Sequence, residues 1–193
     1  MAEAVAIASG PSLTTEDVEL VRHWREASPD RFVIVANTTF RLVPWADAMF
    51  AMDDKWWKVN RAEVRETFKG QAYCHIGESA KGYAVRFENR KRMCLHGNSG
   101  AAILSYCATG NFERIIMLGY DCSVSKGSHW HGDHPKPLGN CGSLHRWPKQ
   151  FENVRAYYPK ANIVNASRRT ALKCFPLIRL EDALGLTAMQ EAA

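Results

Sequence analysis

The feature that most constrains this chain is the regular alternation of short apolar runs with segments of helical character. The apolar runs predict buried strands, because each is bounded by glycine, proline or polar residues. They lie at residues 4–9, 31–36, 47–54, 71–76, 93–96, 115–118 and 162–167. Segments with the spacing or composition of helices lie between most of them, at about 15–27, 55–64, 101–110 and 147–158. This alternation predicts the α/β class: a single Rossmann-like, open, mostly parallel sheet with helices on both faces.

Nearly every predicted strand finishes in a polar residue. These residues are Ser9, Asn37, Asp53, Asp121 and Asn165. Because the carboxyl ends of parallel strands share one edge of a sheet, we expect the ligand site to lie across that edge.

The whole chain, residues 1–193, predicts one nucleotide-binding α/β domain. A length of 193 residues suffices for one core and would be cramped for two. Hydrophobic residues make up 46% and charged residues 23%, which is typical of a globular protein. Two stretches interrupt the alternation: an irregular insertion at about 77–92, and a loop at about 122–146 that we expect near the site.

Cysteine usage and the first residues predict a cytoplasmic protein without a membrane span. The six cysteines form no C-x-x-C pair, and several lie in apolar runs where a reduced thiol packs as a small hydrophobe. The first twelve residues lack the basic region of a signal peptide, and their apolar run is too short to cross a membrane.

The charge balance favours an anionic partner. The net charge is +5, and a basic run contains Arg86, Arg90, Lys91 and Arg92. Such a run suits phosphate groups, including those of nucleic acid, although a solvated face is the alternative. The oligomeric state stays open, and a homo-oligomer is compatible with the sequence.

The first predicted strand runs directly into Gly10, Pro11 and Ser12, and a helix start follows. Glycine lets the backbone approach a ligand, the serine hydroxyl can donate, and the N–H groups of a helix start favour an anion. We therefore expect Ser9 and this turn to contact a nucleotide phosphate. A plain turn is the alternative interpretation.

The next strand ends offer polar groups of a different kind. Asn37 can read a base or ribose, or it can cap a turn. Of the adjacent carboxylates after residue 52, Asp54 is expected to cap the following helix. Asp53 is expected in the site, holding a metal, a ribose or an acceptor.

A strongly apolar helix is predicted to follow Asn98, Ser99 and Gly100. Its small first residues would allow close packing against the sheet. Asn98 or Ser99 could cap this helix or touch a ligand phosphate, and Gly100 would leave space for it.

A histidine-rich loop opens after Asp121. His129, His131 and His134 fall within six residues, close to Asp133. Imidazole titrates near neutrality, so this cluster suits proton transfer, phosphate contact or metal ligation. A solvated polar loop is the alternative.

Short motifs in this order resemble the bacterial family 42 sialyltransferases. The matching residues are Gly10-Pro11-Ser12-Leu13, Asn37, Asn98-Ser99-Gly100, Leu118-Gly119-Tyr120-Asp121 and the loop Ser128 to His134. The loop is similar to a stretch whose first histidine is the catalytic base in that family. The resemblance thus implies that His129 is the base, with Asp121 and His134 as further catalytic candidates.

The same framework is shared with motility-associated-factor glycosyltransferases, archaeal hydroxymethylpterin diphosphokinases and small proteins of phage genomes. For a phage protein the expected location is the host cytoplasm. This chain departs from the sialyltransferases in its additional His131. The tyrosines that hold the nucleotide phosphate there have only Tyr157 and Tyr158 as possible counterparts.

The leading hypothesis is a nucleotide-sugar-dependent glycosyltransferase that needs no metal cofactor. The Gly10 turn and Ser99 would hold the phosphates, Asn37 and Asn165 would orient the base or sugar, and His129 would deprotonate the acceptor hydroxyl. The acceptor, a saccharide, a protein or modified DNA, stays open.

Three alternatives remain open. The first is a magnesium-dependent diphosphokinase, with Asp53 and Asp121 holding the ion against a nucleoside triphosphate. The second is a zinc site built from the loop histidines with Cys141 or His145, although H-x-H-x-x-H is not a standard structural-zinc spacing. The third is a nucleotide-binding accessory protein without enzymatic activity.

Overall fold

The computed structural model describes residues 2–75, 81–82, 85–86, 97–110 and 112–186. The predicted strand at 93–96 lies outside these ranges, as does nearly all of the predicted insertion at 77–92 and most of the basic run. The rest of the chain can be compared with the expectations directly.

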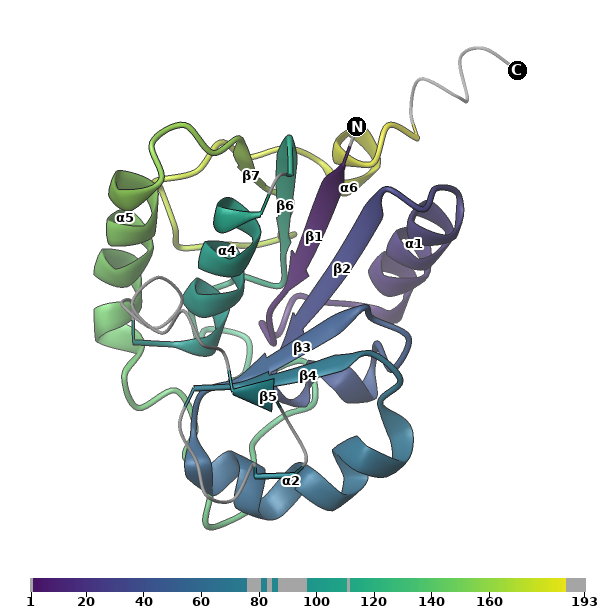
Figure 1. The fold of residues 1–193 in the computed structure, drawn as a ribbon. Coiled ribbons are helices and arrows are strands. Elements are labelled where there is room, and N and C mark those ends of the chain that lie inside the picture. Colours follow the sequence, from purple (N-terminus) through teal and green to yellow (C-terminus); the bar gives the residue numbers. More distant parts are fainter. Residues whose placement is uncertain (1, 76–80, 83–84, 87–96, 111, 187–193) are drawn as a thin grey trace.

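The described strands form one seven-stranded sheet in which every neighbouring pair is parallel, and the predicted Rossmann-like α/β fold is confirmed (Figure 1). The sheet order is β5-β4-β3-β2-β1-β6-β7. The strands are β1 (Glu3–Ile7), β2 (Arg31–Ala36), β3 (Ala48–Ala51), β4 (Gln71–Cys74), β5 (Val85–Arg86), β6 (Arg114–Leu118) and β7 (Ile163–Asn165).

Helices cover both faces of the sheet, as predicted (Figure 1). Alternate side chains of each strand point to opposite faces, so Val5 and Ile7 enter one apolar layer while Ala4 and Ala6 enter the other. The first layer contains residues of α1 (Thr15–Glu26), α2 (Asp54–Thr67) and α6 (Leu180–Ala183). The second contains residues of α4 (Ser99–Thr109) and α5 (Trp147–Tyr157).

The helix starts follow local sequence rules with one correction. Thr14 and Asp17 form a reciprocal capping box on α1, and Asn98 caps α4. At α2 the N-cap position belongs to Asp53 and not to Asp54, which is the first helical residue. The Asp53 side chain makes no capping hydrogen bond, so it stays available to the space in front of the strands.

The strand order places a change of direction between β1 and β6. From β1 the chain adds β2 to β5 outward on one side, and it then returns to lay β6 and β7 on the other. Loops that leave neighbouring strands in opposite directions open a crevice at the carboxyl edge, where α/β proteins bind ligands. Within the described residues, no helix is long and apolar enough to cross a membrane.

Candidate functional site

A cleft of about 690 Å³ lies at the carboxyl edge of the sheet. Its walls come from the segments after β1, β2, β3 and β6, the start of α4, the first turns of α5 and the histidine loop. The predicted site residues that line it are Ser9, Gly10, Pro11, Asn37, Asp53, Ser99, Gly100, His129 and His134. The predicted residues Ser12, Asp121 and Asn165 do not.

The turn after β1 closes onto the end of β6. Ser12 donates to the Asp121 carboxylate from its backbone N–H at 3.1 Å and from its hydroxyl at 2.8 Å. Gly10 donates its N–H to the carbonyl of Gly119 at 2.8 Å. A Cβ on Gly10 would lie 2.1 Å from the Asp121 carboxylate, so only glycine fits there. The Gly-Pro-Ser and Gly-Tyr-Asp motifs therefore form one structural unit.

This unit corrects the expected roles of Ser12 and Asp121. Both are almost fully buried and face each other outside the cleft. Burial raises the pKa of the Asp121 carboxyl, and the hydrogen bonds from Ser12 oppose that rise. The structure thus shows Asp121 holding the turn through Ser12 and not lining the main cleft, where the sequence predicted a catalytic residue.

The turn also lacks the donors that a phosphate cradle needs. The N–H groups of Gly10, Ser12 and Leu13 are all used within the protein, and Pro11 has none. The expectation that this turn holds a phosphate through its backbone is therefore not supported. The turn contributes shape to the cleft, because Ser9, Gly10 and Pro11 form part of its wall.

The start of α4 offers the better anion position. Asn98 accepts from the N–H of Ala101 at 2.8 Å. The Ser99 hydroxyl donates to Asn37 Oδ1 at 2.9 Å and accepts from the N–H of Met52 at 3.1 Å. The hydroxyl thus ties the ends of β2 and β3 to the start of α4, and Ser99 and Gly100, the first residues of that helix, line the cleft.

Two predicted asparagines have different surroundings. Asn37 adopts a left-handed backbone with φ of 50°, a conformation that asparagine tolerates better than most residues, and it lines the cleft. Asn165 is buried away from the cleft, where its amide binds the N–H of Ser167 and the hydroxyl of Thr170. The structure therefore keeps Asn37 as a ligand candidate and gives Asn165 a structural role.

Other expectations are also corrected by position. Asp53 lines the main cleft, whereas Asp121 borders a separate cavity of about 170 Å³. Tyr157 and Tyr158 end α5 and do not line the cleft, which leaves no tyrosine counterpart from that pair for the nucleotide phosphate.

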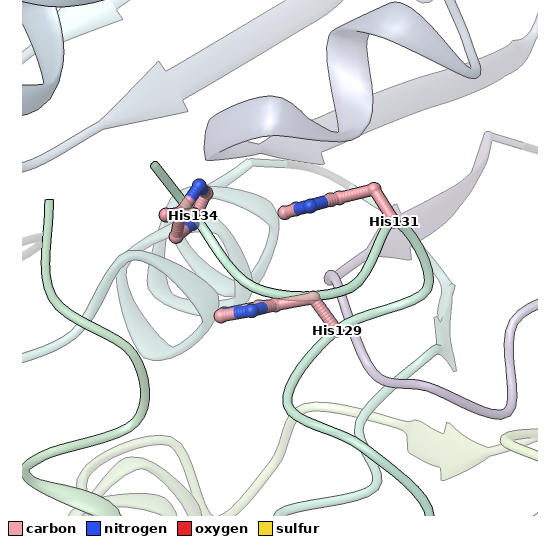
Figure 2. Close-up of side chains that lie close together, drawn as sticks. All are labelled: His129, His131 and His134. Carbon is pink, nitrogen blue, oxygen red and sulfur yellow. The ribbon is translucent and has the colours of Figure 1, made fainter. Parts of the chain in front are cut away.

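The loop histidines pack against one another. Figure 2 shows the rings of His129 and His131 edge-on and nearly parallel, with the ring of His134 beside them. The centroids of His129 and His131 are 5.0 Å apart with 4° between the ring planes. His134 lies 4.6 Å from His129 and 4.7 Å from His131. All three histidines are partly buried, while Gly132 and Asp133 between them are exposed.

Backbone and aromatic contacts hold this loop over the sheet edge. The N–H of Trp130 donates to the carbonyl of Ser9 at 3.1 Å, and the Trp130 side chain packs against the core. The N–H of His134 donates to Asn140 Oδ1 at 2.7 Å. The histidine loop is thus held by hydrogen bonds to Ser9, after β1, and to Asn140, further along the same loop.

Burial keeps the imidazoles neutral. It lowers the pKa of His129 to about 4, with a smaller contribution from His134, and it lowers the pKa of His131 to about 4 as well. The pKa of His134 is also lowered, by burial and by the charge of Arg41. At neutral pH each ring therefore offers a nitrogen lone pair for a proton or a metal ion.

Sequence reasoning missed several residues of the cleft. Lys55 lies in its wall beside Asp53, and Trp147 and Phe151 form an aromatic side of it. A basic residue directly after two strand-end carboxylates is a usable signal. The aromatic residues read as ordinary core positions of a helix, so only the packing of α5 over the sheet edge reveals them.

Comparisons with known proteins add no family assignment. No protein-family model matches the chain, and no curated protein matches it.

Proposed function

We propose that this protein is a nucleotide-sugar-dependent glycosyltransferase. The observation that carries the proposal is the cleft at the carboxyl edge, which combines a helix start suited to phosphate with imidazoles that are unprotonated at neutral pH. The cleft volume of about 690 Å³ lies in the usual range for pockets that bind small molecules and cofactors.

The nucleotide phosphate lies at the start of α4 in this proposal. Ser99 and Gly100 line the cleft at the start of the helix, where the first N–H groups carry a partial positive charge, and Lys55 supplies a full charge in the same wall. Asn37 presents its amide NH₂ to the base or ribose, while its Oδ1 is held by Ser99. Asp53 suits a sugar hydroxyl, since a carboxylate accepts from two donors.

His129 acts as the base. The acceptor hydroxyl gives its proton to the neutral imidazole, its oxygen bonds to the anomeric carbon, and the bond to the nucleotide phosphate breaks with the electron pair leaving on that phosphate. This assignment agrees with the resemblance in the loop sequence. A positioned base of this kind contributes on the order of 10²–10⁴ in rate.

A thermal-shift panel tests the nucleotide part. The panel contains CMP, UDP, GDP, ATP and the common sugar conjugates, each with and without magnesium. Binding to the native state raises its melting temperature by mass action. We expect a shift with one mono- or diphosphate or its sugar conjugate in the absence of magnesium. No shift with any of them would overturn the proposal in favour of a non-enzymatic role, and a strictly magnesium-dependent triphosphate shift would replace it by a diphosphokinase.

A matched pair of variants sharpens this test. Asn37→Asp keeps the left-handed backbone and the acceptor for Ser99, but it places a negative charge beside the phosphate, so we expect at least about tenfold weaker nucleotide binding. Asn162→Asp adds the same charge at an exposed position that does not line the cleft, and binding should not change. Equal affinities for the two variants would remove Asn37 from the ligand site.

A further inference from the structure

The packing of the histidine loop leaves ring nitrogens without protein partners. Four buried side-chain nitrogen or oxygen atoms in the described residues have no hydrogen-bond partner, and three of them belong to the loop: His129 Nδ1, Trp130 Nε1 and His131 Nε2. Buried polar atoms in folded proteins are nearly always paired. Two of these three atoms are imidazole nitrogens, which bind metal ions as readily as protons.

The histidines also converge on one point. A ligating nitrogen from each of His129, His131 and His134 lies within 4.8 Å of the other two (Figure 2). In a tetrahedral site with zinc–nitrogen bonds of about 2.0–2.1 Å, the nitrogens lie roughly 3.3 Å apart. Binding one ion would therefore require the rings to move closer together, and rotation about their side-chain bonds is the simplest movement that would do so.

We propose that His129, His131 and His134 bind one divalent transition-metal ion, with zinc as the preferred ion. Imidazole is a borderline ligand that suits zinc better than magnesium or calcium, both of which favour oxygen. The spacing H-x-H-x-x-H does not match the common structural-zinc patterns, but the turn at Gly132, with φ of 79°, brings the three rings to one side of the loop.

The fourth position of the ion faces the cleft. His129 and His134 line the cleft, whereas His131 stands behind them, outside its wall. Cys141 Sγ lies 3.9 Å from His129 Nε2 and is oriented toward the Ser128 carbonyl at 3.5 Å. We assign Cys141 to the neighbourhood of the ion, and we assign the fourth position to water or substrate, as in catalytic three-histidine sites.

The charges around the histidines are compatible with a cation. Arg41 is near His131 and His134, but its guanidinium is paired with Glu63 at 2.6 Å. Asp133 lies beside the cluster and accepts from the Ser128 hydroxyl at 2.5 Å. The positive charge of Arg41 is therefore balanced by Glu63, and Asp133 adds a negative charge that favours a bound cation.

The chemical role of the ion rests on the proposed glycosyl transfer, although its binding does not. A ligating His129 cannot accept a proton at the same nitrogen. An ion held by the three histidines would supply a bound water of lowered pKa, and that water would serve as the base for the acceptor hydroxyl in place of His129.

Metal stoichiometry tests the site directly. The full chain is stripped with a chelator, dialysed and titrated with Zn²⁺, and bound metal is measured by mass spectrometry. We expect one zinc per chain for the wild type and at least about a hundredfold weaker binding for His131→Gln and His134→Gln. His23→Gln, at an exposed position of α1, should bind as the wild type does. Less than stoichiometric binding by the wild type, or unchanged binding by His131→Gln, would overturn the site.

Two further measurements keep the outcomes separate. The variants Cys141→Ser and His145→Gln should retain the metal, and the cobalt-substituted protein should show no sulfur-to-metal charge-transfer band. Loss of the metal in either variant, or the presence of that band, would mean that a fourth side chain binds the ion and that no position is open. Circular dichroism of the metal-free variants confirms that they fold. The nucleotide panel run on metal-free protein reports on the cleft alone, so the failure of one proposal is distinguishable from the failure of the other.

Discussion

Two neighbouring segments at the carboxyl edge of the sheet use their buried polar atoms in opposite ways. In the turn after β1, every hydrogen-bond donor of Gly10 and Ser12 has a partner, and most of those partners lie on the end of β6. In the histidine loop, one ring nitrogen of His129 and one of His131 are buried without a hydrogen-bond partner.

This difference separates framework from function. A fully paired polar unit stabilises one conformation and has no capacity left for a ligand. An unpaired buried group costs stability, and completion by a bound ion is one way in which a native protein offsets that cost. The turn carries the motif that first indicates a phosphate site, yet the histidine loop is the segment with side-chain atoms that are free to bind a ligand.

The largest effect is expected for Gly10→Ala. The new methyl group would meet the Asp121 carboxylate at 2.1 Å and the Gly119 carbonyl at 2.4 Å, so the turn must move away from β6. We expect a loss of about 3 kcal/mol in unfolding free energy, measured by urea denaturation. Gly142→Ala is the control, because nothing lies within 4 Å of its added methyl group and its stability should stay within about 0.5 kcal/mol.

The next effect concerns the loop and zinc. At a free zinc concentration of about a hundredfold above Kd, the wild type should gain about 2.7 kcal/mol in stability. His131→Gln should gain nothing, although without metal it should be as stable as the wild type to within about 0.5 kcal/mol. A large destabilisation of the metal-free variant would mean that the histidines are framework, like the turn, and the contrast would fail.

A smaller effect is expected for Asp121→Asn. The amide oxygen can still accept from Ser12, but one hydrogen bond to a charged oxygen is lost, and relief from burying a charge offsets part of that loss. We expect a destabilisation of about 1 kcal/mol by urea denaturation, with nucleotide affinity unchanged. A specific loss of turnover in a stably folded Asp121→Asn protein would return this residue to the catalytic set.

A pH dependence of the metal-free protein is also expected. The pKa of His129 and His131 is about 4 in the folded chain against an ordinary 6.5. Between these values the unfolded state binds more protons, so stability falls as the pH drops from about 6.5 toward 4. Over this pH range the melting temperature of the wild type should fall more steeply with decreasing pH than that of the His129→Gln, His131→Gln double variant. Parallel pH profiles would show that the histidines are solvated.

The sequence was a good guide wherever the physical rule is local. Alternating apolar runs predicted the parallel sheet, and the helix start expected after the glycine turn is present, where Thr14 and Asp17 form a capping box. The glycine turn after β1 was also recognised, because strand, turn and helix follow one another directly in the chain.

Partner choice needed the tertiary structure. Asp121 and Ser12 are 109 residues apart, and Asn37 and Ser99 are 62 apart, so nothing local tells which carboxylate or amide will be used up inside the protein. For the same reason Asn165 looked like a ligand residue until its amide was found bound to Ser167 and Thr170.

By itself, then, the sequence determined the fold class, the edge of the sheet that carries the cleft and the set of polar residues near it. Only the tertiary structure decided which of those residues are paired and which are open. The physical reason is that a buried polar atom forms hydrogen bonds with groups that are close in space. Which groups are close is decided by the packing of segments that are distant in the sequence. The three histidines, close in sequence, were already a metal-site candidate, and the fold shows that their ring nitrogens lie within 4.8 Å of one another.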